Sequence, residues 1–334
     1  MIFLIAKRAG MAAITLFGVA VVVFILLRVA PGDPIAMMIG PGATAEDIAR
    51  LRASYGLDQS LFNQFWIWLG SLIQGDFGTS ISRRVDVGQL LLERLPATIE
   101  LALMALLVAV LLGGAIAIVG TLVRRHWSSG ALDGVNGLLL AIPEFVWALA
   151  LVLVLGVAFP VLPLSGRINP SLSTDFRTGF YLLESVLTLR FGLAGDLLRH
   201  MAMPVLALAL PLAGIIARVL REALSEAMMQ DYVTLARVKG MSEIRLVWSE
   251  ALRNAIGPTL ALTGVQFTFL IGGTVIVEKI FSYPGLGNMA IDAVINRDFP
   301  LIQGLVLMFG VLFILINLVV DFAVVAANPR LRHG

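Results

Sequence analysis

The chain has 334 residues, a formal net charge of +2 and an apolar composition, with 59% hydrophobic and only 14% charged residues. Soluble domains carry about a quarter charged residues, so this composition and the mean hydropathy of +0.94 exclude that class. The apolar residues form long continuous runs, which excludes a membrane β-barrel with its alternating pattern, and the small net charge gives no indication of a nucleic-acid partner.

The first apolar run covers residues 9–27 and follows Lys7 and Arg8. It is longer than the hydrophobic part of a signal peptide, and the letters PGDP follow it instead of a small-residue cleavage site. Pro31 and Pro34 end the helix, because proline lacks the backbone N–H that a helix needs. Residues 1–30 are therefore expected to form a retained N-terminal transmembrane helix.

Residues 31–95 are too long for a plain connection between two spans. Thr44 is a candidate N-cap for a helix that ends at Gly56. The letters LFNQFWIWLGSLI predict a second helix, whose Trp66 and Trp68 suit the membrane interface. The segment is therefore predicted to be a helical extension on the extracytoplasmic side.

Residues 96–334 form the predicted core of the membrane protein, with five further runs long and apolar enough to cross a bilayer. These runs cover about residues 96–122, 132–159, 200–220, 258–277 and 300–326. Pro143 lies inside the third run, and membrane helices tolerate such a proline where neighbouring helices bind the freed carbonyl group. The connection 161–199 is rich in Ser, Gly and Asn and is expected to be irregular.

Short basic connections set the expected orientation, because Lys and Arg accumulate in the cytoplasmic loops of membrane proteins. With six spans, all of these short basic segments fall on one side of the membrane. They contain Lys7, Arg8, Arg124, Arg125, Arg221, Arg237, Lys239, Arg245, Arg253, Arg330 and Arg332. Both termini are therefore predicted to be cytoplasmic.

The stretch between the fourth and fifth spans, within residues 222–257, is polar and patterned. In DYVTLARVKG one helical face carries Tyr232, Leu235, Ala236 and Lys239, and Gly240 is placed to end that helix. Ser242 is the candidate N-cap of the next helix.

That next helix is predicted to be amphipathic. Its apolar positions follow helical spacing and are Ile244, Val247, Trp248, Ala251, Leu252 and Ala255. The whole stretch is thus expected to lie on the cytoplasmic surface as a helix, a tight turn and a second helix. An interfacial helix that only anchors the loop is the alternative.

Motifs for chemistry within the chain are absent. None of its three lysines precedes Ser or Thr, so it has no GxxxxGK[ST] phosphate loop. His126, His200 and His333 lie far apart without an HExxH partner, no GxSxG motif occurs, and the lack of cysteine excludes thiolate sites. The chain is therefore predicted not to be an enzyme, and any energy must be supplied by a partner.

Three polar residues inside the spans are candidates for a substrate pathway. Glu144 follows Pro143, and a charged residue within a membrane helix costs about 2.5–3.5 kcal/mol even on insertion scales. Thr263 and Gln266 lie on the fifth span. Each could instead hold helices together by interhelical hydrogen bonds.

The run DYVTLARVKGMSE…ALRNA resembles the coupling segment of ABC-importer permeases, in the form typical of the dipeptide and oligopeptide branch. The letters PGDP, QGDFGTS, FSYPGLG and LINLVVD…NPRLR resemble that branch too. In the general importer pattern Gly240 takes the glycine, whereas Glu250 and Arg253 replace the usual Ile and Pro. The resemblance implies the six-helix fold of type I ABC importer permeases, with a cytoplasmic coupling helix between helices 4 and 5.

The resemblance also implies the partners of the chain. They are a second, homologous permease that forms a heterodimer with it, two cytoplasmic ATPases and an extracytoplasmic binding protein, assembled in a bacterial inner membrane. No cofactor is expected in this chain, since ATP and Mg²⁺ would belong to the ATPases. The expected ATPase contacts are Tyr232, Thr234, Ala236, Arg237, Lys239, Gly240 and Ser242.

Di- and oligopeptides are the cargo that this branch implies. Nickel chelates, glutathione, opines and sugars would suit the same architecture. An ion-coupled secondary transporter is a more distant alternative. Several intramembrane carboxylates and an internal repeat would favour it, and neither is evident.

Overall fold

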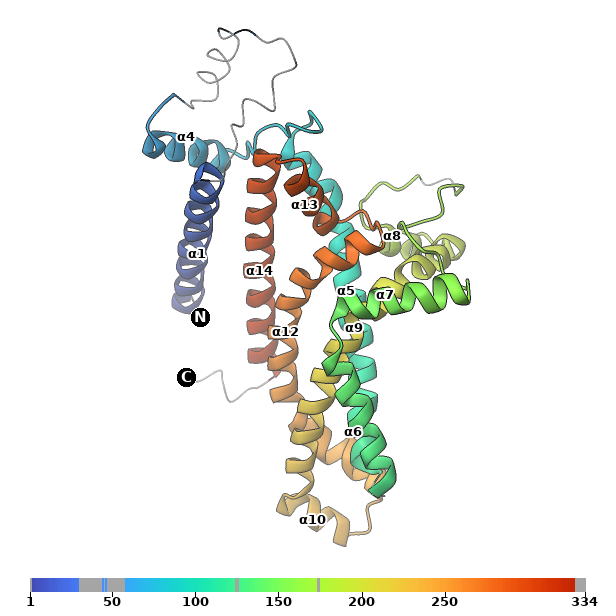
Figure 1. Ribbon diagram of the computed structural model, residues 1–334. Coiled ribbons are helices and arrows are strands. Elements are labelled where there is room, and N and C mark those ends of the chain that lie inside the picture. Colours follow the sequence, from blue (N-terminus) through green and yellow to red (C-terminus); the bar gives the residue numbers. More distant parts are fainter. Residues whose placement is uncertain are drawn as a thin grey trace. The chain divides into compact units, whose positions relative to one another are not determined.

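The computed structural model describes residues 2–29, 44, 46, 58–123, 126–172 and 175–327. These residues are almost entirely helical, and their only β-bridge is an isolated one between Thr79 and Asp86 (Figure 1). They divide into two compact units. The first contains Met1–Leu95 and Met289–Ile314, and the second contains Pro96–Asn288 and Leu315–Gly334. Helices α5, α13 and α14 contribute residues to both units.

The first unit contains two complete helices and parts of three others. They are α1 (Ile2–Val29), α4 (Leu61–Ile73), and parts of α5 (Val87–Leu122), α13 (Leu286–Ile295) and α14 (Phe299–Ala327). Helix α1 contains the predicted first span, and α4 coincides with the predicted helix of the extension. The helix predicted for residues 44–56 lies outside the described residues except at Thr44 and Glu46.

Aromatic side chains join α4 to α1, and α4 lies across one end of α1 (Figure 1). The ring centroid of Phe24 lies 5.3 Å from that of Phe65 and 5.6 Å from that of Trp68. Phe17 contacts Phe65 edge to face at 5.9 Å. Edge-to-face pairs at such distances are favourable beyond their area burial, so these rings fix the extension to the first span.

A buried carboxylate, Asp298, fixes the loop after α4. The hydroxyls of Ser80 and Ser82 donate to Asp298 Oδ2 at 2.6 and 2.7 Å, and the backbone N–H groups of Ile81 and Ser82 donate at 3.1 and 2.9 Å. Burial alone would raise the pKa of Asp298, but these donors stabilise the charged form and hold the pKa below its ordinary value.

The second unit is built around α9 (Phe191–Met228), the most deeply buried of the candidate spans. Gly113 of α5 and Gly214 of α9 allow close helix packing. A Cβ at Gly113 would lie 2.6 Å from the carbonyl oxygen of Ala213, and one at Gly214 would lie 3.1 Å from Leu139 and Leu140. The other elements are α6 (His126–Ala141), α7 (Glu144–Leu151), η1 (Val152–Ala158), α8 (Tyr181–Leu187), α10 (Asp231–Val238), α11 (Glu243–Arg245), η2 (Leu246–Ala251) and α12 (Leu252–Ile280).

The spans agree with the prediction in order but differ in length and continuity. The described residues contain five helices able to cross a membrane, or six if one bent pair counts as a single span. That pair is the predicted third span. It is broken before Glu144, and its parts, Gly130–Ala141 and Glu144–Ala158, meet at 101°. Pro143 explains the break, because its ring excludes the helical backbone of the preceding turn.

The connection expected to be irregular, residues 161–199, contains α8 and the first turns of α9, so that expectation was wrong. A buried ion pair orders it. Arg167 Nη2 lies 2.6 Å from Glu100 Oε2, and Glu100 Oε1 accepts the N–H groups of Leu182 and Leu183 at 3.0 and 3.1 Å. The Arg167 guanidinium lies over the ring of Tyr181, 3.9 Å from its centroid.

A third buried carboxylate, Glu278, organises the FSYPGLG turn after α12. It accepts the Thr98 hydroxyl at 2.7 Å and the N–H of Asn288 at 3.0 Å. Gly287 must lack a side chain, because a Cβ there would lie 2.5 Å from the Cα of Val275 and 3.0 Å from the Glu278 carboxylate. Burial raises the pKa of the neighbouring Tyr283 hydroxyl, in spite of the nearby Arg167 charge.

Candidate functional site

The predicted turn at Gly240 is present. Helix α10 ends in a Schellman motif, in which the N–H of Met241 donates to the carbonyl of Ala236 at 3.2 Å and that of Gly240 to the carbonyl of Arg237 at 3.0 Å. Gly240 has φ +86°, a conformation that favours glycine. A Cβ at Gly240 would meet no atom within 4 Å, so the surroundings of this glycine within the chain are open.

Side chains on both sides of the turn fasten it. Arg237 Nε lies 2.8 Å from Glu243 Oε1, and Asn254 donates to the Tyr232 hydroxyl at 2.8 Å. Ser242 has the extended backbone of an N-cap residue, as predicted, but its hydroxyl makes no capping hydrogen bond. The turn is therefore held by an ion pair and backbone hydrogen bonds rather than by a serine cap.

A buried cluster connects this segment to the long helices. It contains Ala117 of α5, Leu220, Leu224 and Ala227 of α9, and Val247, Ala251 and Ala255. Because these residues are all fully or nearly fully buried, a displacement of the segment after the turn must also displace the ends of α5 and α9.

The apolar stripe predicted for the second helix is only partly correct. Val247, Ala251 and Ala255 are buried, but Ile244 is 61% exposed and Trp248 is 57% exposed. The reason is the π-helical element η2, whose wider turn shifts the buried face away from α-helical spacing. Leu235 and Val238 of α10 are exposed as well. We call these four exposed apolar side chains, which flank Gly240 in the sequence, the turn surface.

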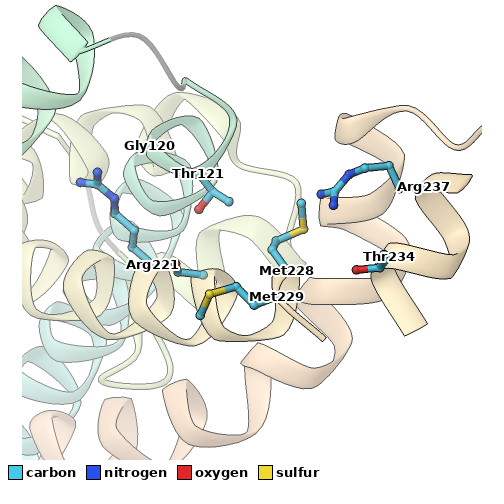
Figure 2. Close-up of a pocket in the computed structure, with 8 residues that line it drawn as sticks. Gly120, Thr121, Arg221, Met228, Met229, Thr234 and Arg237 are labelled. Carbon is cyan, nitrogen blue, oxygen red and sulfur yellow. The ribbon is translucent and has the colours of Figure 1, made fainter. Parts of the chain in front are cut away.

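A cavity of about 530 Å³ lies behind the turn (Figure 2). It is lined by Gly120, Thr121, Arg221, Ser225, Met228, Met229, Thr234 and Arg237. Arg221 and Arg237 lie on opposite sides of the two methionines (Figure 2). Each arginine is paired within the chain, Arg221 with Asp133 and Arg237 with Glu243, so the cavity has no bare positive charge. The described residues contain no group of side chains suited to a metal ion.

The three candidate pathway residues lie on α7 and α12, which contact each other. A Cβ placed on Gly273 of α12 would lie 3.4 Å from Glu144 Oε1. Thr263 and Gln266 lie about 15 and 10 Å further along α12, at 1.5 Å per residue. The Thr263 hydroxyl donates to the Thr259 carbonyl of its own helix at 2.7 Å. The structure therefore does not bring the three residues together.

Sequence reasoning missed three buried carboxylates, Glu100, Glu278 and Asp298. Glu100 lies inside the predicted second span, so the rule that singled out Glu144 could have found it. Glu278 comes one residue after the predicted fifth span. Their partners could not have been named, because Arg167 and Thr98 lie far from them in the sequence.

A helical fold of several membrane spans with a turn fastened to its long helices is that of a type I ABC importer permease. The chain belongs to the family described as binding-protein-dependent transport system inner membrane component, which matches residues 86–333. Residues 1–102 match the N-terminal family of the same membrane components. The chain is therefore a membrane-spanning permease subunit of an ABC importer.

Named relatives agree with this assignment. The chain is 38% identical to the di/tripeptide transport system permease protein DppB of Pseudomonas aeruginosa (strain UCBPP-PA14), with 100% of this chain and 99% of DppB covered. It is 38% identical to the glutathione transport system permease protein GsiC of Salmonella choleraesuis (strain SC-B67), with 96% and 95% covered. Inward facing structures of the MetNI methionine ABC transporter share its fold, with a TM-score of 0.54 and 13% identity. The match covers 72% of this chain and 97% of the MetNI chain.

Proposed function

We propose that this permease forms half of a translocation pathway for di- or oligopeptides, and that a binding protein delivers the cargo. The similarity to a di/tripeptide permease over the full length of the chain carries this proposal. Glutathione is the second candidate cargo, because GsiC is as similar. Uptake of dialanine and of glutathione by the complete reconstituted importer decides between them.

The partners in this proposal are a second, homologous permease and two ATPases that bind ATP with Mg²⁺ on the cytoplasmic side. The α10 turn would face the ATPases, and both termini would be cytoplasmic in a bacterial inner membrane. The basic residues support this orientation. The Lys and Arg residues of the short connections cluster around the turn and near the termini, and such residues accumulate on the cytoplasmic side.

The contact with the ATPases would involve the turn surface together with Lys239 and Ser242, which are exposed. Ala236 and Gly240 are small and permit close approach. Tyr232, Thr234 and Arg237 support the turn, Tyr232 through Asn254 and the other two as part of the cavity wall. The buried cluster behind the turn would carry a movement of the ATPases to α5 and α9.

Gly240→Leu tests this assignment. The left-handed backbone at Gly240 would disfavour leucine by about 1–2 kcal/mol. This cost is small enough for the protein still to insert and fold. A Cβ at this position meets no atom within 4 Å, and the leucine side chain would project into a docked ATPase, where overpacking costs about 1–3 kcal/mol. We expect ATPase activity stimulated by the loaded binding protein to fall about tenfold or more.

Gly192→Leu is the matched control. Gly192 is exposed in the first turn of α9, has no left-handed φ, and also has open space around its Cβ position. The Gly192→Leu variant should associate normally with the ATPases, and the loaded binding protein should stimulate their activity as in the wild type. Normal association, stimulation and transport in Gly240→Leu would refute the coupling role of this turn.

A further inference from the structure

The broken membrane segment holds an acidic side chain without a partner. Glu144 is the first residue of α7, directly after the break at Pro143. Its carboxylate has no hydrogen bond or ion pair with any residue that the structure describes. The three buried carboxylates described above behave differently. Glu100 pairs with Arg167, Glu278 accepts hydrogen bonds from Thr98 and Asn288, and Asp298 accepts them from Ser80 and Ser82.

The same segment contains two further polar atoms without a partner in the described chain. The indole N–H of Trp147 and the side-chain oxygen of Asn136 are both buried and make no hydrogen bond. Glu144 and Trp147 are three residues apart on α7, so they lie on one face of the helix with Cβ atoms about 5–6 Å apart. A negative group and a hydrogen-bond donor are thus placed side by side within the membrane.

A glycine of a neighbouring helix lies beside the Glu144 carboxylate. Helix α7 packs against α9 and α12. A Cβ placed on Gly273 of α12 would lie 3.4 Å from Glu144 Oε1, so no side chain of that residue covers the carboxylate. Glu144 itself is only partly buried, so its carboxylate remains accessible to a group from outside the chain.

An unpartnered carboxylate within a membrane requires a cation, and an unpartnered indole N–H requires an acceptor. The amino-terminal end of a peptide offers both, since its ammonium group and its first carbonyl oxygen lie a few ångströms apart. We propose that Glu144 binds the ammonium group of the cargo and that the Trp147 N–H donates to the adjacent carbonyl oxygen. This inference rests on the proposed function and narrows the cargo to solutes with a free primary amine.

Binding to the assembled permease–ATPase complex in nanodiscs, without the binding protein, tests the site directly. The probes are radiolabelled dialanine and glutathione, each compared with its N-acetylated form. At least one free-amine probe should bind at least tenfold more tightly than its acetylated form. Glu144→Gln should weaken its binding at least tenfold, which corresponds to about 1.4 kcal/mol, and should abolish the preference over the acetylated form.

Two variants and a control complete the test. Trp147→Phe keeps an aromatic ring but lacks the N–H. This variant should weaken the binding of the free-amine probe and of its acetylated form by a similar factor. Glu144→Asp retains the charge and should retain the preference for the free amine. Glu93→Gln removes an exposed carboxylate that contacts Gln89, and it should bind like the wild type.

Three results would overturn the inference. The first is that no probe binds to the wild type. The second is that Glu144→Gln keeps the preference for the free-amine probe over its acetylated form. The third is that the Glu144→Gln complex fails to assemble while the Glu144→Asp complex assembles. The last result would assign Glu144 to an ion pair with the second permease. Uptake by the complete wild-type importer separates this inference from the proposed function. Lack of dialanine uptake would refute the peptide cargo, and lack of glutathione uptake as well would refute both candidate cargoes, whatever the Glu144 variants bind.

Discussion

Asp298 shows how one side chain orders a loop distant from it in the sequence. It is fully buried, and it accepts hydrogen bonds from Ser80, Ile81 and Ser82 as well as one at 3.3 Å from the N–H of Leu301 in the first turn of α14. Because these donors hold its pKa below the ordinary value, the charged form stabilises the fold. This stability is fully present above the unfolded pKa of about 3.9 and is lost as the pH falls through the lower folded pKa.

Asp298→Asn should therefore destabilise the protein in a pH-dependent way. At pH 7 we expect a loss of about 2 kcal/mol, since hydrogen bonds to charged groups contribute about 1.5–3 kcal/mol. The difference from the wild type should shrink as the pH falls below about 4. Denaturant unfolding in detergent between pH 7 and pH 3 measures it, with the exposed Asp175→Asn as control. A difference that stays constant with pH would contradict this prediction.

Sequence reasoning identified residues whose own type or position is unusual. Gly240 was found because glycine ends helices, and Glu144 because a carboxylate is rare within an apolar run. Asp298 could not be assigned, because its partners at Ser80 and Ser82 lie more than 200 residues away. The free N–H of Trp147 was equally hidden, since a tryptophan in an apolar run gives no sign of whether its nitrogen finds an acceptor.

At the scale of elements, several helices end in the same left-handed motif, but not all of them use glycine. Gly75 and Gly240 take the left-handed position after α4 and α10, whereas Leu189, Ser282 and Arg297 take it after α8, α12 and α13. In each motif the residue after the left-handed one donates back to the last turn, as Arg190 does to Ser185 at 2.8 Å. A non-glycine residue in this conformation costs about 1–2 kcal/mol.

Leu189→Gly should therefore stabilise the protein. Leu189 is 71% exposed with φ +57°, so the substitution relieves strain and removes little packing, and we expect a gain of about 1 kcal/mol. Leu183→Gly is the counterpart within α8, at a position 55% exposed, and should lose about 0.5–1 kcal/mol. Unfolding free energies of the two variants in detergent should have opposite signs relative to the wild type.

Element order was predictable from the length of the apolar runs, but helix ends and continuity were not. Helix α9 extends from Phe191 to Met228, well beyond the predicted residues 200–220, because its polar ends remain helical where they pack on other helices. The π-helical turn at Leu246–Ala251 depends on tertiary contacts, and the size of the 101° bend at Pro143 cannot be predicted from the proline alone. Helical periodicity alone therefore placed Ile244 and Trp248 on the wrong face.

At the scale of the whole molecule, composition alone established a multi-pass membrane protein. The proposed side of the membrane for each connection rests on the basic residues, since short loops rich in Lys and Arg tend to remain cytoplasmic. No contact within the chain tests this orientation, so it requires a measurement from outside.

Single-cysteine labelling provides that measurement, and the absence of native cysteine makes it free of background. Gln59, Ser171 and Ser242 are all exposed. In intact cells an impermeant thiol reagent should label Gln59→Cys and Ser171→Cys but not Ser242→Cys, which should react only after permeabilisation. Labelling of Ser242→Cys alone in intact cells would invert the proposed topology.

Two prolines divide α9 into stiff and bendable parts. Pro204 and Pro211 cannot donate to the carbonyl groups of His200 and Ala207, so the hydrogen-bond ladder of the helix has two gaps. From Pro211 to Met228, next to the turn at Gly240, the helix is uninterrupted for about 27 Å at 1.5 Å per residue. We expect this part to move as one rigid piece that bends at Pro211, so that a sideways force at Met228 would turn it about a point inside the membrane.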